Sequence, residues 1–591
     1  MWCKNCSKET YCETCEICGN TTEQDTPLEV YWCSDCKVPI IKEINSVDKS
    51  VCPLCGVEST YMCADLRPVF PEERLLVEIL TAKPFAYKNK TVWASHSRYY
   101  IDGKVKMLTM ATYKKHSVDE IAKLLEEHKA DNDYSFFNKM IDTFVSANKD
   151  RLNYLKEEAF DFIQKSAAKY PPESIVISFS GGKDSTVVAD LAVRALSNPS
   201  LVHIFGDTTL EFPLTMEYAK RFRMDNPKAI FKVAKNKEQD FYKVCEDIGP
   251  PARMLRWCCS MFKTGPITRV LNSLYHDKNI LTYYGIRKCE SVSRSKYKRI
   301  EYNEVYDENS EKVRLSEKIK IQKQTVASPI FFWKDVDIWL YILNEKIDFN
   351  YSYRLGYDRV GCWCCPNNNE RAQFLSKIYM SKQAKKWRNF LIDFAMKIGK
   401  PDAQVYIDTG KWKARHGGNG ISAAEDVKIK FTNCTTEENA KVYNLNKPLT
   451  DNFIELFNPF GREKKELGRK LINETIFVDI KTNVPILSIQ PFSQDGYEFA
   501  IKIKTMNVEK HDDLQRMVGY QIRKYNACRK CLKCESLCKF GAISTFGDTY
   551  HINDAKCKRC KMCVTGKYLE GGCAMNNCLV TKVDGGKELE K

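Results

Sequence analysis

The chain has 591 residues, which is long enough for several domains and more than one hydrophobic core. Most of its 27 cysteines fall in C-x-x-C pairs, which favours metal thiolates in a reducing compartment over a secreted disulfide framework. No apolar run approaches the ~18 residues of a membrane helix, and the N-terminus lacks an apolar signal core, so we expect a cytoplasmic protein without a membrane partner. Lys and Arg total 92 against 76 Asp and Glu, and this charge of +16 favours anionic partners, nucleotides first and nucleic acid second.

Four C-x-x-C pairs in residues 1–62 predict two successive zinc ribbons. In the later quartet, 15 residues separate the pairs, near the spacing of four-thiolate zinc sites; its members are Cys33, Cys36, Cys52 and Cys55. In the earlier quartet, eight residues separate the pairs and Cys12 is a spare thiol, so its ligand assignment stays open; its members are Cys3, Cys6, Cys15 and Cys18. Four thiolates leave no open coordination position, which favours a structural role for zinc.

The next two segments contain no chemical motif. Short apolar runs alternate with turn residues over 63–115, as at 91–94 and 98–105, and predict a small β-rich module. Over 116–170 the apolar residues have helical spacing and predict a helical connector.

Residues 171–400 repeat the order strand, loop, helix. Short apolar runs predict buried strands at 174–179, 201–205, 229–233 and 280–284. The expected fold is therefore α/β, a doubly wound parallel sheet that binds a nucleotide at the carboxyl ends of its strands. Residues 401–517 predict an α+β module of unknown role.

A glycine-rich loop follows the first of these strands and precedes a helical stretch; its sequence is Ser180-Gly181-Gly182-Lys183-Asp184-Ser185. Two glycines allow a tight turn that directs N–H groups at an anion, and the helix dipole adds to the attraction. The Lys183 ammonium and the two serine hydroxyls suit a phosphate chain. The pattern is not G-x-x-x-x-G-K-[ST], which disfavours a Walker-type ATPase. It resembles the pyrophosphate loop of the adenine-nucleotide α-hydrolase superfamily, whose members cleave ATP between the α- and β-phosphates or bind sulfonucleotides.

Further motifs follow in a fixed order: Asp207 to Pro213, Arg256 to Pro266, Gly285 to Arg294 and Pro329 to Trp339. Over about residues 171–371 this order resembles the phosphoadenosine phosphosulfate reductase family. The resemblance implies that Asp207 and the loop surround the adenosine. It also implies that phosphate or sulfate oxygens are bound by Lys263, Arg287 and Arg294, and the arginine fork fits such anions.

The same resemblance gives the central cysteines a role. Adenylylsulfate reductases of this family carry a [4Fe-4S] cluster on a Cys-Cys pair and a later C-x-x-C, which implies the ligands Cys258, Cys259, Cys362 and Cys365. Cys364 is an alternative to either of the last two, and zinc or free thiols are the alternative to a cluster. The reductases end in a Glu-Cys-Gly-x-x-His-like segment with the attacking cysteine, which this sequence lacks. The remaining candidates for that thiol are Cys245, Cys289, Cys364 and Cys434.

The C-terminal residues 518–591 resemble a two-cluster [4Fe-4S] ferredoxin domain. Cys528-x2-Cys531-x2-Cys534-x3-Cys538 matches the bacterial ferredoxin run, although Lys539 occupies the usual proline position. A second run is followed by two further cysteines; its residues are Cys557, Cys560 and Cys563. The crossed ligation of that family implies that the first three cysteines share a cluster with Cys573 or Cys578, and that the second run shares one with Cys538. Zinc is the alternative.

Together these features predict an enzyme, with two reactions open. The first is reductive cleavage of an adenylated sulfate to sulfite, with electrons from the ferredoxin domain and an electron donor protein behind it. The second is an ATP-dependent sulfurtransferase that adenylylates and then thiolates tRNA, DNA or a small molecule. The intact Lys183, the missing reductase cysteine, the zinc ribbons and the basic charge favour the second. A non-enzymatic subunit with a regulatory nucleotide site is the third alternative.

Overall fold

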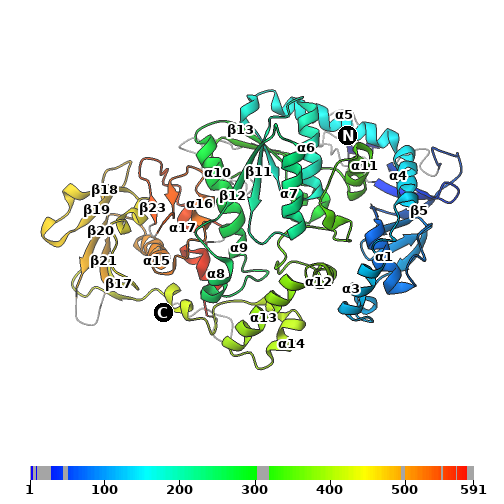
Figure 1. Cartoon of the computed structure of the whole chain (residues 1–591). Helices are drawn as coiled ribbons and strands as arrows, with labels where there is room; N and C mark the ends of the chain where they lie inside the picture. Colours follow the sequence, from blue (N-terminus) through cyan, green and yellow to red (C-terminus); the bar gives the residue numbers. More distant parts are fainter. Residues whose placement is uncertain are drawn as a thin grey trace.

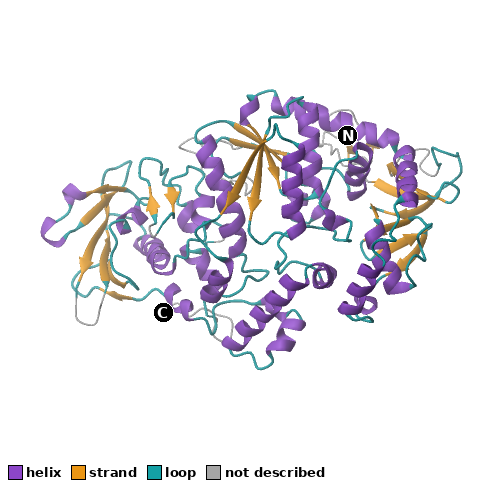
Figure 2. Cartoon of the chain, viewed as in Figure 1, coloured by secondary structure: helices purple, strands orange, loops and turns teal. Residues whose placement is uncertain are grey.

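The computed structural model describes residues 2–3, 8–9, 28–43, 51–302, 319–493, 499–547, 550–567 and 569–581. Three groups of strands lie side by side across the molecule: the N-terminal sheets, a central sheet and a C-terminal antiparallel sheet (Figures 1 and 2). Within these residues, no helix combines the length and the apolar character needed to cross a membrane. Of the first predicted zinc ribbon, only two short backbone strands fall among the described residues, β1 (Trp2–Cys3) and β2 (Lys8–Glu9).

Residues 28–107 form two small antiparallel sheets. The first has the order β4-β3-β5 and consists of β3 (Leu28–Cys33), β4 (Val38–Glu43) and β5 (Thr60–Cys63). The second consists of β6 (Arg67–Pro68), β7 (Val92–Ser95), β8 (Arg98–Ile101) and β9 (Lys104–Met107). Helix α1 (Pro71–Thr81) lies between β6 and β7 in the sequence. Four more helices follow β9: α2 (Met110–Tyr113), α3 (Val118–Glu127), α4 (Ser135–Ala147) and α5 (Lys149–Ala167). Strands β7, β8 and β9 fall where short strands were expected, and residues 116–170 are largely helical. Helix α1, inside the segment expected to be β-rich, was not predicted.

The central sheet has the order β12-β11-β10-β13-β15-β14, and its first five strands are parallel. The six strands of this sheet are β10 (Ile175–Phe179), β11 (Val202–Asp207), β12 (Ile230–Lys235), β13 (Ile280–Tyr284), β14 (Ile300–Glu301) and β15 (Gln324–Ala327). Strand β14 pairs antiparallel with β15. The associated helices are α6 (Lys183–Ala195), α7 (Pro213–Asp225), α8 (Phe241–Ile248), α9 (Trp257–Cys259), α10 (Gly265–Tyr275) and α11 (Asp335–Glu345). The doubly wound fold and the positions of its four predicted strands are confirmed. Burial is confirmed for three of them, whereas β12 at the sheet edge is largely exposed, with Ile230 and Val233 at 44% and 49% exposure. Because strand order reverses beside β10, the loop after β10 lies at the switch point where such sheets bind ligands.

The C-terminal part joins three helices to a six-stranded antiparallel sheet and a cysteine-rich end. The first helices are α12 (Glu370–Tyr379), α13 (Ser381–Lys397) and α14 (Ala403–Asp408). The sheet, in spatial order, consists of β16 (Phe431–Asn433), β17 (Ala440–Asn444), β21 (Ala500–Thr505), β20 (Pro485–Phe492), β19 (Thr475–Val478) and β18 (Arg462–Lys464). The final elements are α15 (His511–Ala527), α16 (Lys533–Leu537), β22 (Ile543–Ser544), β23 (His551–Ile552), α17 (Met562–Thr565) and α18 (Ala574–Leu579). The module boundary predicted after residue 517 falls inside α15, which continues without a break to the first cysteine run.

Polar contacts attach the cysteine-rich end to the central domain. Arg269 on α10 pairs with Glu535 on α16, with Nε 2.7 Å from Oε2. Arg529 pairs with Asp247 at the end of α8 at 2.5 Å, and the Gln322 N–H donates to the Lys539 carbonyl at 2.9 Å. Helices α8 to α10 therefore lie between the central sheet and the C-terminal cysteines (Figure 1).

A buried carboxylate connects the N-terminal module to α12. Glu73 is fully buried and accepts hydrogen bonds from Arg67 at 2.6 and 2.7 Å, Arg371 at 2.6 Å and the Tyr99 hydroxyl at 2.7 Å. Although burial raises the pKa of Glu73, the two guanidinium charges more than compensate and hold that pKa below its usual 4.5.

We predict that Glu73→Gln destabilises the fold by about 3–5 kcal/mol, because the guanidinium groups of Arg67 and Arg371 lose their buried counter-charge and keep only the exposed Asp358 carboxylate. A carboxylate with a lowered folded-state pKa stabilises the fold above its unfolded pKa and loses this effect as the pH falls. The gap in urea stability between wild type and variant should therefore shrink below pH 4.5. Glu425→Gln, which removes an exposed pair with Lys428, is the control and should change little. An equal effect of the two substitutions would contradict the prediction.

Candidate functional site

The loop after β10 is built to present its backbone to a ligand. Gly181 has φ +69°, and a Cβ there would lie 3.0 Å from the Thr215 methyl group, so the left-handed turn and the space both require glycine. The Ser185 hydroxyl donates to the Gly182 carbonyl at 2.9 Å and accepts the Ser180 N–H at 3.1 Å. These bonds tighten the turn at the start of α6, where N–H groups favour an anion.

Lys183 belongs to a buried network of two cations and two carboxylates. Its Nζ lies 3.0 Å from Asp335 Oδ1 and 3.4 Å from Asp184 Oδ2. Arg287, which follows β13, pairs with Asp184 at 2.6 Å and with Asp335 at 3.0 Å. Burial pushes the pKa of Asp335 upward, but the Lys183 and Arg287 charges hold it at about 2. The network is electrically balanced, and it joins the loop to β13 and to the start of α11.

Sequence reasoning missed two members of this site. Asp335 supplies the counter-charge just described, and the Tyr353 hydroxyl accepts the Lys183 N–H at 3.1 Å. Both residues lie more than 140 positions beyond the loop in the sequence, so no local pattern relates them to it. The acidic residue in the first turn of α11 was the one available signal for Asp335.

The predicted adenosine contact, Asp207, ends β11 next to the loop. Its carboxylate accepts the Thr209 N–H at 2.8 Å and pairs with Lys235 at the end of β12 at 2.9 Å. Arg294 lies farther out, where it pairs with Glu290. The pKa of Arg294 is lowered, first by burial and then by the nearby Arg359 charge.

The central cysteines meet at the carboxyl ends of β11 and β12. Cys258 and Cys259 lie on α9, which a π-helical turn over residues 260–264 joins to α10. The other cysteines come from the loop at 362–365, where a β-bridge links Glu211 to Cys362 and the Trp363 N–H donates to the Leu210 carbonyl at 2.9 Å. Such π-turns are frequent at functional sites because they re-aim side chains.

Cationic side chains surround these thiols. Arg256 Nη2 donates to Cys259 Sγ at 3.4 Å. The pKa of Cys259 is lowered to about 5. The first cause is a hydrogen bond from Cys258 and the next favourable one is the Arg256 charge, and together they outweigh the effect of burial. Burial raises the pKa of Cys362 to about 12, while the Lys263 charge opposes this rise. Lys263, the predicted oxyanion contact, therefore lies beside the central cysteines, and its side chain is exposed.

The four candidate attacking thiols differ in their exposure and in their place in the fold. Cys245 and Cys364 are buried, at 0% and 4% exposure, and burial raises the pKa of both. Cys434 follows β16 in the C-terminal sheet, where its sulfur contacts the Thr436 hydroxyl. Cys289 is exposed, and Arg287 Nη1 donates to its sulfur at 3.5 Å. Cys289 is therefore the exposed candidate, and Arg287 connects it to the network around Lys183. Its thiol donates to the Trp333 carbonyl at 3.5 Å.

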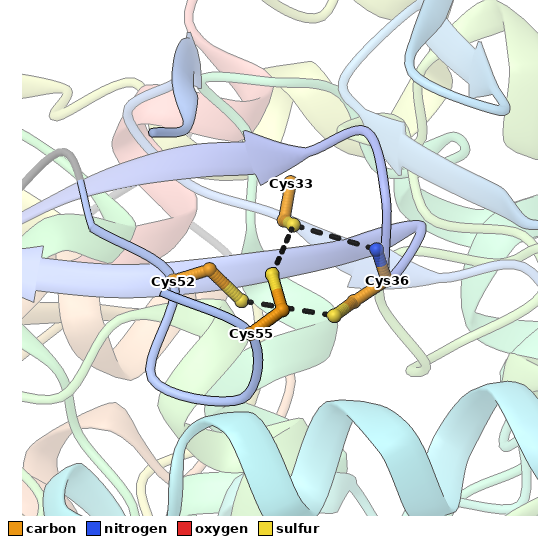
Figure 3. Close-up of side chains that lie close together, drawn as sticks. All are labelled: Cys33, Cys36, Cys52 and Cys55. Carbon is orange, nitrogen blue, oxygen red and sulfur yellow. Dashed lines mark hydrogen bonds between the residues drawn. The ribbon is translucent and has the colours of Figure 1, made fainter. Parts of the chain in front are cut away.

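The later N-terminal quartet forms a compact group of thiols (Figure 3). Cys33 and Cys36 flank the β3–β4 turn, and Cys52 and Cys55 lie on the loop before β5. Sγ–Sγ distances are 3.6 Å for Cys33–Cys55 and 3.9 Å for Cys36–Cys52, and all four sulfurs lie within 4.8 Å of one another. Tetrahedral Zn–S bonds of about 2.3 Å place sulfurs about 3.8 Å apart, so the group fits one zinc ion. The earlier quartet lies outside the residues whose side chains are described.

The C-terminal cysteines fall into two sets. Burial raises the pKa of Cys531, and the neighbouring thiols of Cys573, Cys534 and Cys528 raise it further. In the other set, burial raises the pKa of Cys538 to about 11, with a further contribution from Cys560 and Cys557. Cys563 is influenced by Cys534, Cys538 and Cys560, so it adjoins both sets. The charged neighbour of Cys578 is instead Arg415. The crossed ligation that the ferredoxin resemblance implies stays a prediction.

The two cysteine runs share a backbone conformation. In the first, Lys530 and Leu532 have φ of 53° and 59°; in the second, Arg559 and Lys561 have φ of 53° and 58°. Left-handed backbone is rare for such side chains, so its repetition at matching positions shows two copies of one loop. Each loop offers cysteine thiolates, the ligands that a [4Fe-4S] cluster takes.

A cavity of about 420 Å³ is bordered by α12, α13 and α14. Cys364 and Cys365 line it. Its aromatic walls are Trp363, Trp387 and Trp412, and the Trp387 ring meets each of the other two edge-on at about 6 Å. The cavity is large enough for a small-molecule ligand.

Comparison with known proteins agrees with the motifs. Residues 174–368 match the model of the phosphoadenosine phosphosulfate reductase domain. An uncharacterized protein of Methanocaldococcus jannaschii is 31% identical over 49% of this chain; the chain spans only 56% of that relative's length. The adenosine 5'-phosphosulfate reductase of Staphylococcus epidermidis is 23% identical over 39% of this chain and 85% of its own. Among solved structures, the phosphoadenylyl-sulfate reductase of Candida auris is similar over 37% of this chain and 97% of its own, at 16% identity and a TM-score of 0.27.

Proposed function

Since the chain carries a phosphoadenosine phosphosulfate reductase domain, we propose that it reductively cleaves an adenylated sulfate to sulfite and a nucleotide. The observation that carries this proposal is the position of Cys289 and Arg287 at the glycine-rich loop, together with Lys263 beside the central cysteines. A sulfonucleotide held by the loop would thus meet both a thiol and cations suited to its oxygens.

Iron–sulfur clusters are part of the proposal. The donor sets are Cys258, Cys259, Cys362 and Cys365; Cys528, Cys531, Cys534 and Cys573; and Cys538, Cys557, Cys560 and Cys563. Cys531 and Cys573 pack in the same apolar cluster as Cys258 and Cys362. Clusters bound by these sets would supply electrons one at a time. We assign zinc to the N-terminal quartet, in a structural role.

The protein's own residues would act as follows. The Cys289 thiolate attacks the sulfur of the adenylated sulfate, an S–S bond forms, the S–O bond breaks and the nucleotide leaves with that oxygen. Two electrons then cleave the S–S bond, which releases sulfite and restores the thiolate. Arg287 contacts the Cys289 sulfur and opposes the rise that burial imposes on its pKa, which favours the reactive thiolate.

The experiment is anaerobic turnover of the reconstituted full chain with adenylyl sulfate and, separately, its 3'-phosphorylated form, with dithionite as reductant. We expect sulfite and a nucleoside phosphate in equal amounts. Lys183→Ala should lower the rate about 10²-fold or more, because the loop loses a buried cation. If neither sulfonucleotide is consumed, the proposal is wrong.

One observation favours a second candidate, an ATP-dependent sulfurtransferase. The tryptophan-lined cavity is bordered by Cys365 and has room for a small molecule that accepts sulfur. A reductase that receives its electrons from its own ferredoxin domain does not need such an acceptor. This enzyme would release AMP and pyrophosphate from ATP only when an acceptor such as tRNA is present. Release that is indifferent to every acceptor would count against it.

A further inference from the structure

One of the two C-terminal cysteine sets reaches the surface. In the second set Cys560 is exposed, Cys557 is half-buried, and Cys538 and Cys563 are buried. In the first set no cysteine is exposed: Cys528 and Cys531 are half-buried, and Cys534 and Cys573 are buried. Because electron transfer requires close approach, the set that contains Cys560 is the one that a protein in solution can approach.

The surface around Cys560 is basic. Between Asn553 and Lys567 the sequence has five basic residues and one acidic residue. Lys556 and Lys558 are exposed and Lys561 is half-exposed, and none of these three lysines forms an ion pair with any residue that the structure describes. The one acidic residue, Asp554, is already paired with Arg559.

The charged residues in and beside the first cysteine run are already paired with other parts of the chain. Arg529 pairs with Asp247 and Asp426. Glu535 pairs with Arg269, and the Lys539 ammonium donates to the Ile319 carbonyl. Charges of the first loop thus hold it against the central domain, while the lysines of the second remain available to a partner.

The two sets are also connected. Burial raises the pKa of Tyr550, and the thiols of Cys534 and Cys563 raise it further, which places this ring beside both sets. The first set in turn shares an apolar cluster with the central cysteines. The second set, the first set and the central cysteines are therefore neighbours in that order, from exposed Cys560 to the nucleotide domain.

We propose that Lys556, Lys558 and Lys561, with Cys560 at their centre, form the docking surface for a small acidic electron-donor protein. This inference rests on the proposed function. Charge complementarity steers such encounters and raises their association rate, and redox complexes use small interfaces, below about 1,200 Å² in total. In each encounter the donor would lose one electron, and a [4Fe-4S] cluster held by Cys538, Cys557, Cys560 and Cys563 would accept it, so two encounters would supply the two electrons for one sulfite.

The test measures binding directly, with a strongly acidic two-[4Fe-4S] ferredoxin as the probe and the reconstituted full chain. Calorimetry gives Kd at about 0.01 M salt, where the Debye length is about 30 Å, and at about 1 M, where it is about 3 Å. We expect wild type to bind at least tenfold more weakly at high salt. The triple variant Lys556→Glu, Lys558→Glu, Lys561→Glu should lose at least tenfold at low salt.

A matched control reverses three exposed lysines on α7 and the β12 edge, Lys220→Glu, Lys228→Glu and Lys232→Glu, and should leave Kd unchanged. Both variants must keep the iron content and visible spectrum of wild type. Sulfite formation driven by dithionite should be equal in all three proteins, while formation driven by the ferredoxin should fall in the first variant alone. No salt-sensitive binding by wild type, or an equal loss in both variants, would overturn the docking surface. Failure of dithionite to yield sulfite would instead overturn the proposed function.

Discussion

Replacing Cys573 with serine is expected to remove about four iron atoms per chain, the content of one [4Fe-4S] cluster, whereas Cys578→Ser should remove none. Burial raises the pKa of Cys573 to about 12, and the thiols of Cys534 and Cys528 raise it further. Burial also raises the pKa of Cys578 to about 12, but its charged neighbour is Arg415. We therefore expect Cys573, rather than Cys578, to be the fourth ligand of the proposed first set.

Both variants would be reconstituted anaerobically and compared for iron, acid-labile sulfide and the electron paramagnetic resonance of the reduced protein. The pair is well matched, because both thiols are buried, at 5% and 3% exposure, and both flank or lie on α18. A general loss of folding would affect the two variants alike. Loss of iron from Cys578→Ser together with retention by Cys573→Ser would contradict the assignment.

Replacing Cys289 with serine is expected to lower sulfite formation by at least about 10³-fold, because the chain loses its attacking nucleophile. Among the four candidate thiols, Cys289 combines exposure with a contact to the loop network through Arg287. A serine hydroxyl is nearly isosteric but is far less nucleophilic than a thiolate. Binding of the sulfonucleotide should change little, so the loss should appear in kcat rather than in KM.

Cys434→Ser is the control, since this thiol lies at the β16 end of the C-terminal sheet, and it should keep the wild-type rate. A second readout is mass spectrometry of wild-type protein mixed with sulfonucleotide in the absence of reductant. We expect a sulfo group on the peptide that contains Cys289. A normal rate in Cys289→Ser would show that an external thiol or another residue attacks the sulfur.

Local pattern was sufficient for four strands of the central sheet and for the loop. Three of the apolar runs form buried parallel strands, because a sheet covered on both faces requires short, continuous apolar segments. The fourth run forms β12, which pairs in parallel at the sheet edge and is largely exposed. The glycine-rich loop begins α6 because Gly181 adopts a conformation that other residues avoid. Strand β15 was missed, since its polar residues Gln324 and Thr325 break the apolar pattern although both are buried.

The sequence by itself determined the α/β class of the central domain, the place of the loop and the spacing of the cysteine runs, because these depend on neighbours a few positions apart. Only the tertiary structure decided which distant groups meet. It brought Asp335 and Arg287 to Lys183, it placed Cys573 rather than Cys578 beside the first cysteine run, and it left Cys289 exposed. Such pairings follow from how whole elements pack, and burial and charge at each site are then set by residues that no local pattern connects.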